Sequence, residues 1–172
     1  AKPRRRKNKD SKNYQTFRKK KEFNNQLDKC YLLLGKAYFY KKKYTMANNT
    51  FRFIQRQYAE DEALMTEVSI WLFRSLTEMG RYEEAARIMD RLDGSTLKRK
   101  QREMVAAART DFYVRQGMYE QAIPEAERLV RTCKSIKRKP RYNFLLSQLY
   151  VKENQDGAAK LALKKATRFN FN

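Results

Sequence analysis

One short pattern recurs four times along the chain, and it limits the folds that the chain can adopt. In each copy, an alanine follows the first residue by three positions and another apolar residue follows it by seven. The copies begin at Tyr44, Tyr82, Tyr119 and Asp156. The second copy follows the first by 38 positions, and the next two follow at intervals of 37. Self-similarity at such a period indicates stacked structural repeats rather than one globular core.

The residues before the first copy predict the other half of a helical hairpin. Tyr31, Leu34 and Tyr38 fall on one face of a helix. Gly35 has no Cβ, so a second helix can cross it closely. The lysines at 41–43 form the polar corner between the two helices. Together with the recurring pattern, these residues complete the tetratricopeptide spacing W-x2-L-G-x2-Y…A-x3-F, with Tyr31 in place of the tryptophan.

A hairpin of this kind can bury its apolar face only when neighbouring hairpins stack on it. The chain has 5 glycines and 3 prolines and no long alternation of apolar and polar residues, which favours helix over sheet. We therefore predict an all-α, right-handed solenoid of about four tetratricopeptide-type repeats over residues 27–172. The units are expected at about 28–61, 66–99, 103–136 and 140–172. A basic extension, residues 1–26, precedes them and is predicted to be partly disordered, because its start contains few apolar residues.

The charge of the chain points to an anionic partner. Lysine and arginine number 40 against 19 acidic residues, which gives a formal net charge of +21. A charge of this size attracts polyanions, and the candidates are nucleic acid, anionic lipid, an acidic cell-wall polymer or an acidic protein. A solvated basic surface with no partner is the alternative.

The residue types argue against catalysis. The chain contains no histidine, which removes His-based acid–base chemistry and the commonest metal ligand. Cys30 and Cys133 fall in different units, so we expect neither a disulfide nor a metal site. The acid pair Glu83-Glu84 lies at a helix start, where carboxylates favour the helix dipole. We therefore predict that the chain is not an enzyme and has no cofactor and no small-molecule substrate.

The first helix of each hairpin is expected to line a concave groove. The helical spacing places a mixture of apolar and charged residues there, which suits a peptide or helix of a partner protein better than a phosphate backbone. Some of them could instead pack against neighbouring hairpins. Trp71 is expected to pack at the junction with the first unit, with stacking on a ligand as the alternative. The predicted groove residues are Lys29, Leu32, Lys36, Phe39, Glu67, Ile70, Arg74, Thr77, Met104, Ala107, Asp111, Val114, Arg141, Phe144, Gln148 and Val151.

Two clusters of basic residues lie one repeat apart, at the junctions after the second and third hairpins. Equivalent junctions of a solenoid emerge along the same edge, so the two clusters are predicted to form one positive stripe. We expect this basic edge to contact an acidic protein or an anionic envelope surface, with RNA binding or a solvated edge as the alternatives. Its members are Lys98, Arg99, Lys100, Arg102, Lys134, Lys137, Arg138 and Lys139.

Three runs of the sequence resemble one family of repeat proteins: CYLLLGKAYFYKKKYTMANNTFRFI, MGRYEEA and KPRYNFLLSQLYVKENQDGAAKLALKKA. They are similar to the tetratricopeptide lipoproteins of bacterial gliding motility and type IX secretion (the SprE/PorW group), in which a similar YxLMGKAxFY run opens the repeats. The likeness covers most of residues 27–166. The resemblance implies a periplasmic scaffold associated with the outer membrane, whose partners are components of the secretion machinery or the envelope.

Overall fold

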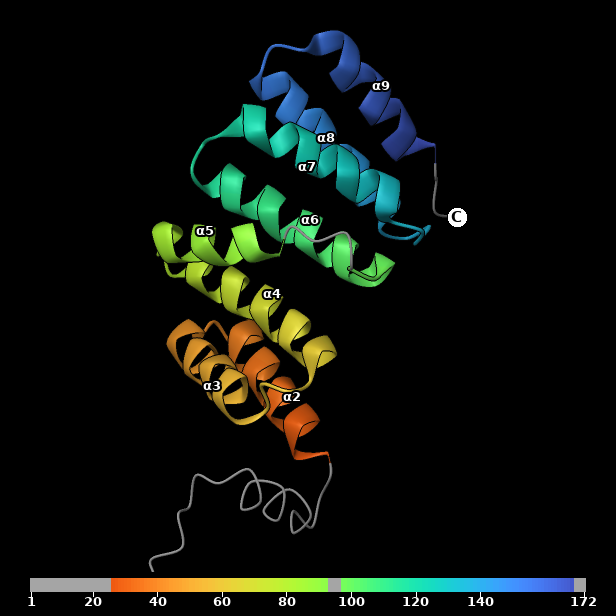
Figure 1. The fold of residues 1–172 in the computed structure, drawn as a ribbon. Coiled ribbons are helices and arrows are strands. Elements are labelled where there is room, and N and C mark those ends of the chain that lie inside the picture. Colours follow the sequence, from red (N-terminus) through yellow and green to blue (C-terminus); the bar gives the residue numbers. More distant parts are fainter. Residues whose placement is uncertain (1–25, 93–96, 169–172) are drawn as a thin grey trace, which may run out of the picture.

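The computed structural model describes residues 26–92 and 97–168, and they form four helical hairpins (Figure 1). The prediction of an all-α solenoid is confirmed, since each hairpin packs on the next along the chain. Almost all of the predicted basic extension lies outside the described residues. The helices are α2 (Leu27–Tyr40), α3 (Tyr44–Gln57), α4 (Glu62–Glu78), α5 (Tyr82–Arg91), α6 (Arg99–Arg115), α7 (Tyr119–Thr132), α8 (Lys139–Lys152) and α9 (Asp156–Thr167).

The corner of each hairpin contains one residue in the left-handed backbone region. These residues are Lys42 (φ 58°), Gly80 (φ 71°), Gly117 (φ 72°) and Asn154 (φ 56°), which stand at the same place in successive repeats. Glycine and asparagine enter this region at low cost, whereas a lysine is strained there. The second helix then starts two residues later, at the first residue of each recurring pattern.

The buried core divides into two clusters. One extends from α2 to α6 and the other from α7 to α9. The repeat pattern predicts eight residues packed between the helices. Six of them are buried, whereas Tyr38 and Tyr113 lie at the edges of the clusters and stay partly exposed. The six are Phe51, Leu72, Leu76, Ala85, Leu129 and Leu149. Among the described residues, no helix is both long and apolar enough to span a membrane.

The first hairpin depends on the close approach of α2 and α3 at Gly35. A Cβ placed on Gly35 would overlap the Phe51 ring, with Cδ1 and Cζ of that ring only 2.9 Å away. We expect Gly35→Ala to lower the free energy of unfolding by about 1–3 kcal/mol, because the buried ring cannot move aside. Gly157→Ala in α9 is the matched control: its Cβ would meet no atom within 4 Å. There the change should be neutral or stabilising, by about 0.5–1 kcal/mol. Thermal unfolding of both variants would show whether their effects have opposite signs.

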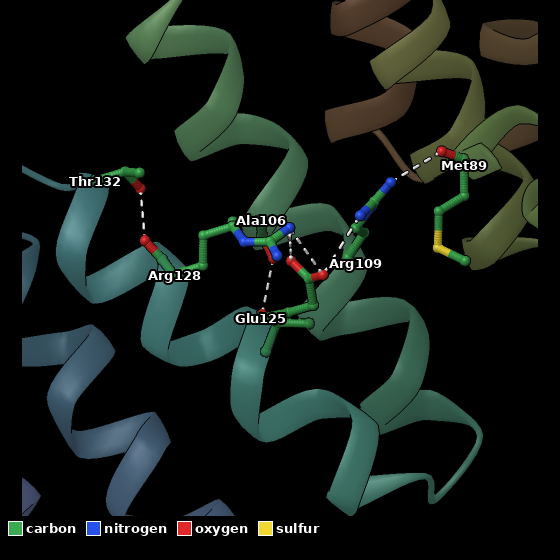
Figure 2. Close-up of polar contacts among 7 residues, drawn as sticks. Met89, Ala106, Arg109, Glu125, Arg128 and Thr132 are labelled. Atoms are coloured by element: carbon green, nitrogen blue, oxygen red, sulfur yellow. Dashed lines mark hydrogen bonds and ion pairs between the residues drawn. The ribbon is translucent and has the colours of Figure 1, made fainter. Parts of the chain in front are cut away.

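The joint between the second and third hairpins contains a buried ion pair (Figure 2). Arg109 of α6 stands in the register that leucine occupies in α4 and α8. Its guanidinium donates to the carbonyl oxygen of Met89 in α5 at 3.0 Å and to Oε1 of Glu125 in α7 at 3.4 Å. The side chains of Arg109 and Glu125 are 10% and 11% exposed. Glu125 also accepts from Arg128, which is more exposed, at 3.3 Å. One arginine thus connects α5, α6 and α7.

Candidate functional site

A groove of about 680 Å³ runs along the first helices of the hairpins. Residues of α2, α4 and α6 form most of its wall, and the start of α8 closes one end. The lining residues are Lys36, Tyr40, Glu67, Trp71, Arg74, Glu78, Lys100, Glu103, Met104, Ala107, Asp111, Arg138 and Tyr142.

Aromatic side chains form the part of the groove nearest the first hairpin. The Trp71 ring lies 5.3 Å from Phe39 and 5.7 Å from Tyr40, measured between centroids. Trp71 therefore packs on the first hairpin, as predicted, and also lines the groove. The Arg74 guanidinium covers the Trp71 ring at 4.4 Å from its centroid, a cation–π contact. Tyr40 is 70% exposed, which leaves an aromatic surface available at the mouth of the groove.

Ion pairs between consecutive hairpins hold the charged walls of the groove in place. Lys36 of α2 pairs with Glu67 of α4 at 2.7 Å. Arg138, at the start of the fourth hairpin, pairs with Glu103 of α6 at 2.8 Å. Each such pair is partly exposed and contributes at most about 1 kcal/mol to stability. Their effect on the site is orientation, since they fix the Glu67 and Glu103 carboxylates, the Lys36 ammonium and the Arg138 guanidinium along the walls.

One further ion pair connects the second and third hairpins at the far ends of their first helices. Arg115 of α6 reaches Glu78 of α4 at 2.7 Å and Asp111 of its own helix at 3.0 Å.

Burial, followed by hydrogen bonding to Glu78, raises the pKa of Tyr44 in the first hairpin. Burial likewise raises the pKa of Tyr142. Both hydroxyls therefore stay protonated at neutral pH and can donate hydrogen bonds.

The charges that line the groove cancel. Four basic residues (Lys36, Arg74, Lys100 and Arg138) face four acidic ones, which are Glu67, Glu78, Glu103 and Asp111. This balance is unexpected in a chain with a formal net charge of +21. The excess positive charge of the protein therefore lies outside the groove.

The predicted groove residues divide into four groups. Lys36, Glu67, Arg74, Met104, Ala107 and Asp111 do line the groove. The prediction is wrong for Leu32, Phe39, Ile70 and Thr77, which are buried between helices. Val114 is partly buried in the second core cluster. The remaining residues lie on the described surface outside this groove: Lys29, Arg141, Phe144, Gln148 and Val151.

The wrong assignments have one geometric cause. On α4 the sequence pattern chose Ile70 and Thr77, whereas the groove face carries Trp71 and Glu78, each one position later. A shift of one position turns the face of a helix by about 100°. Sequence reasoning also missed Tyr40, Glu103 and Tyr142 as lining residues. A usable signal existed for Tyr40 and Glu78, which lie one helical turn after the groove residues Lys36 and Arg74.

The basic edge lies at one end of the groove. Figure 1 shows the start of α6 and the turn between α7 and α8 on the same side of the molecule. The ion pair between Arg138 and Glu103 brings the two clusters into contact, and Lys100 and Arg138 also line the groove. Lys139 is partly buried, and the other members are exposed. Whether this edge binds a partner remains a prediction.

A second depression, of about 480 Å³, lies on the other side of the helices, between α3, α4 and α5. Arg52 and Glu84 form an ion pair of 3.2 Å in its wall. It involves only the first two hairpins, whereas the groove involves all four. The groove is therefore the better candidate for a site that depends on the stacking of repeats.

The architecture defines a helical-hairpin solenoid of the tetratricopeptide class, and two comparisons agree with it. A tetratricopeptide-repeat family model matches residues 140–172. The solved structure of a MamA protein (MamA RS-1 ArsTM double mutant) superposes with a TM-score of 0.61 over 91% of this chain and 81% of the other, at 13% sequence identity. That likeness shows the fold alone. Comparison with curated proteins gave no match.

Proposed function

We propose that this chain is a non-enzymatic scaffold that binds a segment of a partner protein in the groove of its first helices. The observation that carries the proposal is the balance of four basic and four acidic lining residues beside exposed aromatic surface. Helical-repeat solenoids use extended surfaces of this kind for binding. Aromatic and arginine side chains at the centre of a contact supply most of the binding energy in protein interfaces.

The same balance argues against RNA as the occupant of the groove. A groove that follows a nucleic-acid backbone needs a uniform excess of lysine and arginine. Here Glu67, Glu78, Glu103 and Asp111 would face the phosphates. A peptide or helix with both apolar and polar side chains can instead contact the aromatic, the basic and the acidic residues that line the groove. RNA binding is therefore the less favoured function.

Blocking the groove tests this proposal. Ala107 of α6 is partly buried in the groove wall, and Ala107→Arg would place a long side chain inside. Peptides would first be selected from a random displayed library against the unaltered chain. We expect the selected peptides to bind Ala107→Arg at least about tenfold more weakly, because the new side chain occupies their site.

Gln121→Arg is the matched control, since it adds the same charge to an exposed position of α7, a helix that does not line the groove. It should leave the affinity unchanged. Circular dichroism would verify that both variants fold. Equal binding by the two variants would refute the proposal.

We further propose that the scaffold works in a bacterial envelope complex of gliding motility or type IX secretion, as a periplasmic protein associated with the outer membrane. The support is the resemblance of residues 30–54, 79–85 and 139–166 to that lipoprotein family. Cell fractionation with an epitope-tagged protein tests the location. Recovery in the cytoplasmic fraction, without secretion components after crosslinking, would exclude this context.

A further inference from the structure

The basic edge and the groove form one continuous surface. Lys100 and Arg138 belong to both, so a bound segment that leaves the groove at this end passes directly onto the basic edge. Figure 1 shows the start of α6 beside the turn that leads into α8. A single bound segment can therefore contact both features.

The basic edge, unlike the groove, has an unbalanced charge. Residues 97–103 and 133–141, which contain it, include one carboxylate, that of Glu103. Within the described residues, Arg138 is the member of the edge that forms an ion pair, and that pair is with Glu103. Lys98, Lys100 and Lys137 are exposed to solvent. The positive charge at this end of the groove is thus not neutralised by the described part of the chain.

We infer that the partner segment has two parts: an amphipathic stretch with apolar or aromatic anchors, and next to it a run of acidic residues. The amphipathic stretch lies in the charge-balanced groove against the exposed Tyr40 ring. The acidic run lies on the basic edge, where its carboxylates meet Lys98, Lys100 and Lys137. This inference rests on the proposed function, because it assumes that the groove binds a protein segment.

An acidic peptide fits these observations better than RNA or a lipid surface does. A nucleic acid is negatively charged along its whole length. The protein surface, in contrast, is positive only at the basic edge, and acidic side chains such as Glu67 and Glu78 line the groove beyond it. A membrane surface presents many headgroups at once and does not enter a groove. Only a chain that changes from acidic to amphipathic complements both parts.

Two labelled synthetic peptides provide the test, with fluorescence anisotropy at several salt concentrations as the measurement. Both contain the same amphipathic stretch with leucine and tryptophan; one carries a run of glutamates at one end, and the other carries glutamines there. The edge variant replaces Lys98, Lys100, Lys137 and Lys139 with glutamine. The control variant replaces Lys41, Lys43, Lys160 and Lys164 with glutamine as well, and these four lysines are exposed on other parts of the surface. Both variants lose the same amount of charge.

We expect the glutamate peptide to bind the unaltered chain at least about tenfold more tightly than the glutamine peptide, with the difference shrinking as salt rises. The edge variant should remove this preference, and the control variant should change it by less than about twofold. Equal binding of the two peptides, or equal loss in the two variants, would overturn the inference.

The design separates failure of the inference from failure of the proposed function. If Ala107→Arg weakens the binding of both peptides but the edge variant weakens the binding of neither, the groove binds partner segments. The inference that such a segment carries an acidic run is then wrong. If neither change has an effect, the groove itself is not the site. Oligouridylate and phosphatidylglycerol vesicles serve as competing polyanions. Tighter binding of either one, abolished by the edge variant, would replace the acidic peptide with RNA or lipid.

Discussion

Replacing Glu125 with alanine is expected to lower the free energy of unfolding by about 3–5 kcal/mol. The change removes one partner of the buried Arg109–Glu125 ion pair, at the joint that connects α5, α6 and α7. Breaking a buried ion pair from one side costs more than the loss of the methylene contacts. Glu120→Ala is the control, because Glu120 is an exposed acid of the same helix. It should change stability by less than about 0.5 kcal/mol.

Replacing the other partner of this ion pair, in Arg109→Leu, is expected to lower the free energy of unfolding much less than Glu125→Ala does, or to raise it. Glu125 keeps its contact with the more exposed Arg128 when Arg109 is gone. Leucine is also the residue at the equivalent positions, Leu72 and Leu146. Exchanging a buried ion pair for apolar packing is often neutral or favourable. Denaturant unfolding of both single variants and the double variant would measure this asymmetry; equal losses from the two single changes would contradict the described geometry.

Leu72→Ala is expected to cost about 2–5 kcal/mol, because Leu72 is only 2% exposed and belongs to the first core cluster. The equivalent residue of the first hairpin, Leu34, is 41% exposed. Leu34→Ala removes the same atoms from a partly solvated site and should cost less than about 1 kcal/mol. Chemical denaturation of the two variants measures the cost of the same substitution at equivalent repeat positions, one of them buried and the other partly exposed. A loss below about 1 kcal/mol at Leu72 would show that the inward face of α4 is misassigned.

The repeat pattern predicted the fold because it combines several independent constraints. The spacing that begins at Tyr44 fixes the start of each second helix, and Gly35 fixes how closely α2 and α3 approach. The corner residues Gly80 and Gly117 adopt the left-handed conformation that this residue type permits. These features depend on neighbours within one hairpin, so a single sequence contains the information.

The face of each helix that lines the groove was harder to predict. It depends on how consecutive hairpins rotate against each other, and both Ile70 and Trp71 are compatible with a helical period. The sequence also showed that Arg109 replaces the usual leucine, but it could not show that Glu125, 16 positions later, would lie opposite. Ion pairs between hairpins, such as Lys36 with Glu67, arise from the stacking and have no local signature.

Site-specific photocrosslinking in cells of the native organism tests most directly whether the groove binds a protein. A photoreactive amino acid would replace Tyr40, at the mouth of the groove, or Gln121, on the exposed face of α7. The account predicts a discrete protein adduct from position 40 that disappears in the Ala107→Arg background, and no such adduct from position 121. Equal adducts from both positions, or adducts at position 40 that nuclease removes, would contradict it.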